Sequence, residues 1–126
     1  FPRFYSPGHA HGPVSQRVEQ ATEVAATAAA QWDVLGRSTG LVLGIDPPHA
    51  VALDAAWIDE LIREIEQRAA EQGLAGPART PYLLSELARL TDGRSLVANL
   101  GLLANNAAIA AEVAAAIAAE SESDDV

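Results

Sequence analysis

The sequence predicts a helix-rich piece of an α/β domain. Four segments have helical periodicity or helix start and stop signals, whereas one short apolar run is typical of a strand covered on both faces. Such a strand needs neighbouring strands. Either the first 17 residues contribute them, or they lie on a different polypeptide segment and pair in parallel through a crossover helix. The second alternative also explains a chain that starts with Phe1-Pro2 rather than methionine.

The first part of the chain is predicted to form a loop, a helix and the strand. Residues 1–17 are rich in proline, glycine and aromatic residues, which suits an ordered loop lying against a larger body. Residues 21–35 should form a helix that ends at Gly36. Residues 41–45 are the strand, because they are apolar without alternation and Pro47-Pro48 follows them. The apolar stripe of the first helix consists of Val24, Ala28, Trp32 and Leu35.

The second and third helices have the clearest signals. Residues 54–72 carry apolar side chains at spacings of three and four, with Gly73 after them. Thr80-Pro81 is a capping hydroxyl followed by proline, and it should start a helix that runs to about Thr91. Asp92-Gly93 makes the next turn. The apolar stripe of the second helix consists of Ile58, Leu61, Ile62, Ile65 and Ala69.

The last helix spans residues 94–120, with Ser95 as its cap. Residues 121–126 are acidic and lack aromatic or branched aliphatic side chains before the final valine, so we expect them to be disordered.

The composition is that of a soluble globular protein. The chain has 126 residues, of which 49% are hydrophobic, and a formal net charge of −9 at pH 7. This charge repels nucleic acid and anionic lipid, so neither is expected as a partner. All basic residues are arginines, and there is no lysine or cysteine, hence no Schiff base or thiolate nucleophile. No serine nucleophile motif is present either, so we expect no catalytic residue in this segment.

Three asparagines in the last helix are the best candidates for a binding site, because asparagine is a mediocre helix former. At about 100° per residue, Asn99 and Asn106 share a face, with Leu103 between them, whereas Asn105 points away. A buried amide either ties a neighbouring loop or binds a ligand. Since it offers a donor beside an acceptor, Asn99 or Asn106 is suited to the edge of a flat heterocycle such as uracil.

Other polar residues favour structural interpretations. His9 and His11 have a spacing that can ligate a metal, but no acidic or cysteine ligand is near in sequence, so a polar loop is the preferred interpretation and no metal ligand is assigned. Trp32 and Trp57 are expected in the core or at an interface. A solvated face is predicted for the acids and arginines of the second helix, namely Asp59, Glu60, Arg63, Glu64, Glu66 and Arg68.

Four blocks of sequence resemble one enzyme family. These are "FPRFY" with "VSQRV", then "GLVL" before two prolines, then "TPYLLSELARLTDGRSL" and "ANLGLLANNAAIAAEVA". In this order and spacing they resemble the carboxy-terminal part of the pseudouridine-5′-phosphate glycosidases, also called the indigoidine synthase A-like family. The resemblance covers residues 1–120, and residues 121–126 form a separate tail.

The resemblance implies a cytoplasmic, homotrimeric enzyme with a three-layer α/β/α domain and a mixed sheet. It implies cleavage or formation of a carbon–carbon glycosidic bond to ribose 5-phosphate through a lysine imine. The lysine and a divalent metal, manganese in this family, belong to the amino-terminal part, so this segment alone should be inactive. Asn99 matches the family asparagine that contacts the base, and Asn106 supports it.

One departure bears on the substrate. Ile45 replaces an asparagine that follows the strand in the family, and a less polar residue near the site favours an aromatic polyketide over uracil as the aglycone. Some members join such an aglycone to ribose 5-phosphate, as in alnumycin biosynthesis. The alternative from another class is a non-catalytic helical module that oligomerises through its alanine-rich last helix.

Overall fold

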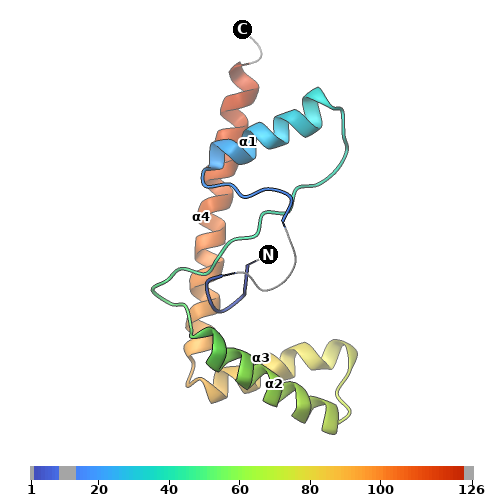
Figure 1. Cartoon of the computed structure of the whole chain (residues 1–126), viewed down its shortest axis with the longest axis vertical. Helices are drawn as coiled ribbons and strands as arrows, with labels where there is room; N and C mark the ends of the chain where they lie inside the picture. The colour runs from blue at the N-terminus through green and yellow to red at the C-terminus, as the bar shows by residue number, and fades with distance from the viewer. Residues whose placement is uncertain (1, 9–13, 124–126) are drawn as a thin grey trace.

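The computed structural model describes residues 2–8 and 14–123. Its longest element is α4, and α1 crosses one end of this helix while α2 and α3 lie at the other end (Figure 1). The elements are α1 (Ala21–Ala29), a π-helical turn η1 (Ala30–Val34), α2 (Ala55–Glu71), a 3-10 turn η2 (Gly76–Ala78), α3 (Arg79–Leu90) and α4 (Arg94–Ser123).

The predicted strand at residues 41–45 does not form. No strand occurs among the described residues, and residues 41–45 belong to the long coil between η1 and α2. The prediction that this run is buried on both faces is wrong here as well, since Val42 is 85% exposed. A strand exists only when its backbone pairs with another strand, and the described part of the chain offers no partner. This segment is therefore helical, and the sheet of the predicted α/β/α domain is not seen in it.

The helix boundaries agree closely with the sequence prediction, but the caps predicted for α3 and α4 are wrong. Asp54 caps α2 by accepting a hydrogen bond from the Trp57 backbone N–H at 2.8 Å. Thr80 is not the cap of α3, because the turn at Gly76–Ala78 leads directly into a helix that starts at Arg79. Ser95 is not the cap of α4 either, because its backbone N–H donates to the Thr91 hydroxyl.

The turn between α3 and α4 shows how Thr91 acts. Asp92 and Gly93 both have positive φ, as the Asp-Gly signal predicts. The buried Thr91 hydroxyl donates to the Leu87 carbonyl at 2.7 Å and accepts from the Ser95 N–H at 3.1 Å. One hydroxyl therefore joins the end of one helix to the start of the next.

The main core lies where α2, α3 and the start of α4 meet. Its buried members are Tyr5, Ile58, Ile65, Leu87 and Ala98. Tyr5 belongs to the amino-terminal loop, and its carbonyl accepts a hydrogen bond from the Leu53 N–H at 2.8 Å. The prediction that this loop lies against a larger body is thus confirmed for Tyr5, and the predicted apolar stripe of α2 supplies the opposite side.

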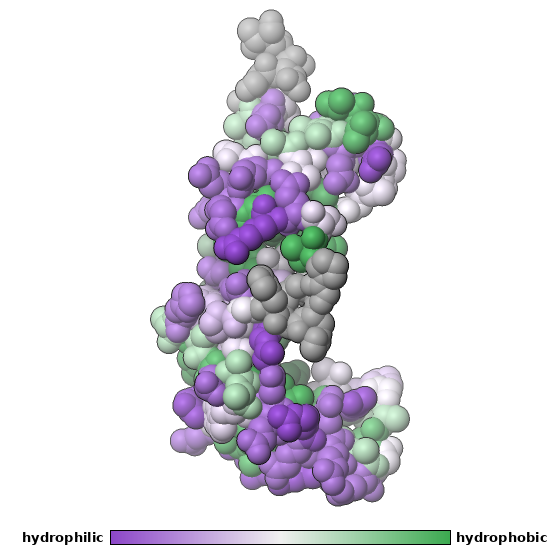
Figure 2. Space-filling model, viewed as in Figure 1, coloured by the Kyte–Doolittle hydropathy of each residue, from purple (hydrophilic) through white to green (hydrophobic). Residues whose placement is uncertain are grey.

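A second contact joins α1 to α4. Ala25 and Ala28 are buried there, while Val34 and Leu35 at the end of η1 are 80% and 59% exposed. The apolar patch that they form lies beyond the carboxyl end of α1 (Figure 2). Of the predicted stripe of the first helix, only Ala28 is therefore buried.

Helix α4 meets a simple test for a membrane span. Residues 94–121 are long and apolar enough to cross a bilayer by length and composition, with Glu112 as a charged residue inside the run. The core helix of a globular protein satisfies the same test, and alanine contributes most of the apolar character here. The helix also runs to Ser123, beyond its predicted end at residue 120, and residues 124–126 lie outside the described part.

Candidate binding site on the last helix

The three asparagines border the buried side of α4. Ala98 is fully buried and Leu102 nearly so, and both face the packed interior. Asn99 and Asn106 lie beside these two residues on the helix, and both are half-buried, as a shared face predicts. Asn105 is half-buried too, on the other side of the same buried strip. All three amides are therefore in the region between interior and solvent.

Asn106 has the most unusual environment. Its carbonyl oxygen is buried and accepts no hydrogen bond in the described part of the chain. A buried acceptor without a donor costs about 1–3 kcal/mol, so such groups in native proteins need an explanation. One explanation is that this oxygen accepts a hydrogen bond from a ligand. Another is that it accepts one from a further part of the protein. The asparagine face could thus accept a hydrogen bond from an imide or hydroxyl donor.

Ile45 lies in the coil between η1 and α2, where it is half-buried. Val51 of the same coil packs closely on α4: a Cβ at Gly101 would come within 2.7 Å of the Val51 Cγ2 atom. At about 100° per residue, Gly101 lies on the side of α4 away from Asn99 and Asn106, so Val51 packs on the helix opposite the candidate face. The place of Ile45 beside the asparagines remains a prediction.

A hollow between the amino-terminal loop and α2 was not predicted from the sequence. It is open to solvent, has a volume of about 480 Å³, and is lined by residues 2–6 and by one side of α2. Arg3 forms a 2.6 Å ion pair with Asp59 at its edge, and Arg63 adds a second cation. Burial raises the pKa of the Tyr5 phenol, which lines the hollow, above its ordinary value of 10. The only sequence signal for the hollow is the "FPRFY" block, which carries part of the family resemblance.

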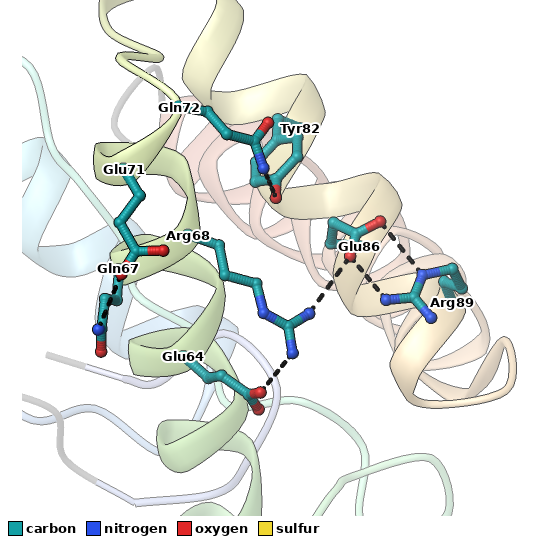
Figure 3. Close-up of polar contacts among 8 residues, drawn as sticks. All are labelled: Glu64, Gln67, Arg68, Glu71, Gln72, Tyr82, Glu86 and Arg89. Atoms are coloured by element: carbon teal, nitrogen blue, oxygen red, sulfur yellow. Dashed lines mark hydrogen bonds and ion pairs between the residues drawn. The ribbon is translucent and has the colours of Figure 1, made fainter.

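The charged residues of α2 and α3 form ion pairs rather than a catalytic cluster. Arg68 of α2 reaches both Glu64 on its own helix and Glu86 on α3, and Arg89 contacts Glu86 at 2.8 Å (Figure 3). A second cross-link joins Glu66 to Arg79 at 2.9 Å. The predicted solvated face of the second helix is confirmed for these groups, which hold helices together.

The two tryptophans make structural contacts and add no reactive group. Trp57 packs against the main core with the Arg94 guanidinium 4.4 Å from its ring centroid, and the Trp32 indole N–H donates to the Thr39 carbonyl. His9 and His11 lie outside the described residues. Within residues 2–8 and 14–121, no three histidine, aspartate or glutamate side chains come together in a way that could hold a metal ion.

Comparison with known proteins relates this chain to one enzyme family. Residues 1–116 match the family described as indigoidine synthase A like protein. A pseudouridine-5′-phosphate glycosidase of Herpetosiphon aurantiacus is 40% identical over 116 residues, which are 92% of this chain and 38% of the relative. One from Frankia alni is 40% identical over 123 residues, which are 98% of this chain and 34% of the relative. This chain thus spans less than two fifths of the length of these curated relatives.

A solved structure is similar over the same region. The prealnumycin C-glycosynthase AlnA, in complex with ribulose 5-phosphate, superimposes with a TM-score of 0.76 at 32% sequence identity. The match covers 90% of this chain and 37% of that protein. The fold described above is therefore also found within a longer polypeptide.

Proposed function

Because this chain belongs to the indigoidine synthase A-like family, as its motifs predict, we propose that it is the carboxy-terminal part of an enzyme that forms or cleaves a C-glycosidic bond. The observation that carries the proposal is the agreement of two comparisons: relatives about 40% identical that are named pseudouridine-5′-phosphate glycosidases, and a C-glycosynthase of the same fold. Both names describe a carbon–carbon bond between a sugar and an aglycone. The sugar proposed here is ribose 5-phosphate, and the structural neighbour binds the related ribulose 5-phosphate.

The amino-terminal part of the enzyme supplies the reactive groups in this proposal. A carbon–carbon glycosidic bond has no electronegative leaving atom to protonate, so a lysine imine at the first carbon of the sugar offers an easier route. This chain contains no lysine. The divalent metal, manganese in our proposal, would also be held there, since the described residues bring no ligand cluster together. In this proposal the complete domain has three α/β/α layers, and residues 41–45 pair with a strand of its sheet.

The role proposed for this chain is to bind the aglycone. Asn99 offers a donor and an acceptor to the edge of a flat ring, and Asn106 supports it with its free carbonyl oxygen. Ile45 makes the site less polar and favours an aromatic polyketide. Efficient release of uracil from pseudouridine 5′-phosphate by the complete enzyme would instead favour pseudouridine breakdown.

The remaining proposals concern the assembly. We place the enzyme in the cytoplasm as a homotrimer, with α4 as a core helix covered by the rest of the domain. The net charge of −9 is unfavourable for association with anionic lipid, which argues against a membrane role for α4.

Trapping with borohydride tests where the imine forms. The complete enzyme would be incubated with ribose 5-phosphate and borohydride, digested, and analysed by mass spectrometry. We expect the sugar on a lysine of the amino-terminal part and none on residues 1–126, because this chain has no amine on a side chain. Absence of any lysine adduct would contradict the imine mechanism.

Replacing Asn99 with alanine tests the binding role. In the complete enzyme, we expect Asn99→Ala to reduce kcat/KM at least tenfold, since a hydrogen-bonding pair to the aglycone is lost, with little change in Tm. Asn105→Ala is the matched control and should keep most of the activity. A fall in Tm with unchanged activity would favour a purely structural role, as in the alternative of a helical oligomerisation module.

A further inference from the structure

The first half of α4 carries a second apolar side that nothing in the described structure covers. We call it the outer face and define it by Leu96, Val97, Leu100 and Leu103, which are 54–57% exposed. At about 100° per residue they lie opposite Ala98 and Leu102, which are buried in the main core. Glu112 is the only charged residue between residues 95 and 119, so no ring of charges shields the helix.

We infer that the outer face binds the amino-terminal part of the family domain, a deepening that rests on the proposed function. Four exposed aliphatic side chains on one side of a helix normally pack against another element of the protein. The four side chains are aliphatic and uncharged, so the surface they fit is an apolar face of a helix or sheet.

The comparison with AlnA supports this choice of partner. The matched segment has the same fold in a protein of which it makes up only 37%, so most of that protein is available to cover it. The coil beside the outer face needs cover too, because Val42 is 85% exposed, and Val51 of the same coil packs on Gly101, one helical turn from Val97. Apolar side chains of both α4 and the coil are thus open to solvent among the described residues.

Cysteine labelling tests the inference cleanly, since the chain contains no cysteine. Leu100→Cys would report on the outer face, and Glu71→Cys on the exposed side of α2 would be the control. Each variant is made in the isolated chain and in a fusion with the cysteine-free amino-terminal part of the Herpetosiphon aurantiacus relative. We expect labelling of Cys at position 100 by a polar maleimide to slow at least tenfold in the fusion, with the control unchanged.

Several results would overturn the inference. One is equal labelling at position 100 in the fusion and in the isolated chain. If position 100 stays accessible in the fusion but becomes protected in the isolated chain at high protein concentration, the outer face binds a second copy. If it becomes protected only with phosphatidylcholine vesicles, the outer face binds a membrane. A wild-type fusion that does not unfold cooperatively would also count against it.

A charge on the outer face gives an independent measurement. Leu100→Glu should leave the Tm of the isolated chain nearly unchanged, because the side chain is already exposed, and lower the Tm of the fusion by about 5 °C or more. Activity of the fusion separates the two proposals: an active fusion with an accessible position 100 refutes the interface alone. A protected but inactive fusion refutes the proposed function alone.

Discussion

The carbonyl oxygen of Asn106 is buried in the packing of α4 and accepts no hydrogen bond among the described residues. The two neighbouring asparagines are half-buried without such an orphaned atom. Asn106 shares a helix face with Asn99 and is unfavourable for the stability of the segment. This is what a binding site would show, since functional sites often violate a local rule of stability.

Replacing Asn106 with leucine should separate stability from function. We expect Asn106→Leu to stabilise the isolated chain by about 1 kcal/mol, because the unpaired acceptor disappears, and to reduce activity of the complete enzyme. Asn105→Leu is the matched control and should stabilise less, since it removes no orphaned oxygen. Chemical denaturation measures both. A less stable Asn106→Leu chain would mean that the amide is paired in solution.

At the scale of elements, α2 and α3 are held side by side by apolar stripes and by cross-links at their exposed edge. The Gln72 amide donates to the Tyr82 hydroxyl at 3.1 Å near one end, and Arg68 reaches Glu86 further along (Figure 3). The hydrogen bonds from Arg89, together with the positive charges of Arg89 and Arg68, lower the pKa of Glu86 below its ordinary value of 4.5.

This shift predicts a pH dependence of stability. Because the pKa of Glu86 is lower in the folded state than in the unfolded state, the stabilisation is complete above pH 4.5 and is lost as the pH falls through the folded-state pKa. The difference in unfolding free energy between wild type and Glu86→Gln should therefore shrink below that pH. Urea denaturation between pH 7 and pH 3 measures it. For the control Glu71→Gln, where the carboxylate accepts a hydrogen bond from the neutral amide of Gln67, we expect a nearly constant difference.

At the scale of the whole molecule, the described segment consists of two packing units that share α4. Helix α1 contacts α4 but neither α2 nor α3, and α2 and α3 pack together at the other end (Figure 1). The contact with α1 is made by alanines, whereas the other unit buries Ile58, Ile65 and Leu87. Since buried apolar area drives folding, the α2–α3 unit should be the more stable one.

A core substitution tests this division. Ile65→Ala should destabilise the α2–α3 unit by roughly 2–5 kcal/mol through the lost burial and the cavity left behind. Amide hydrogen exchange should then speed up in α2 and α3 much more than in the contact of α1 with α4. The exposed Leu84→Ala serves as control. Equal acceleration along the whole chain would show that the two units unfold together.

The sequence alone determined the features that depend on neighbouring residues. The stripe through Ile58 and Ile65 predicted α2, and Asp92-Gly93 predicted a turn, in which the structure has both residues at positive φ, because helix periodicity and backbone sterics act within a few residues. The motifs also identified the family, and the three asparagines were found from their low helix propensity.

Tertiary structure decided what depends on distant partners. The run at residues 41–45 remains a coil, since a strand needs another backbone to pair with and the described chain has none. Thr91 rather than Ser95 joins α3 to α4, and Arg3 pairs with Asp59 across 56 residues, because such contacts arise only when the chain has folded. Likewise, the need for glycine at position 101 follows from the close contact of Val51. Local sequence rules do not describe such packing between distant segments.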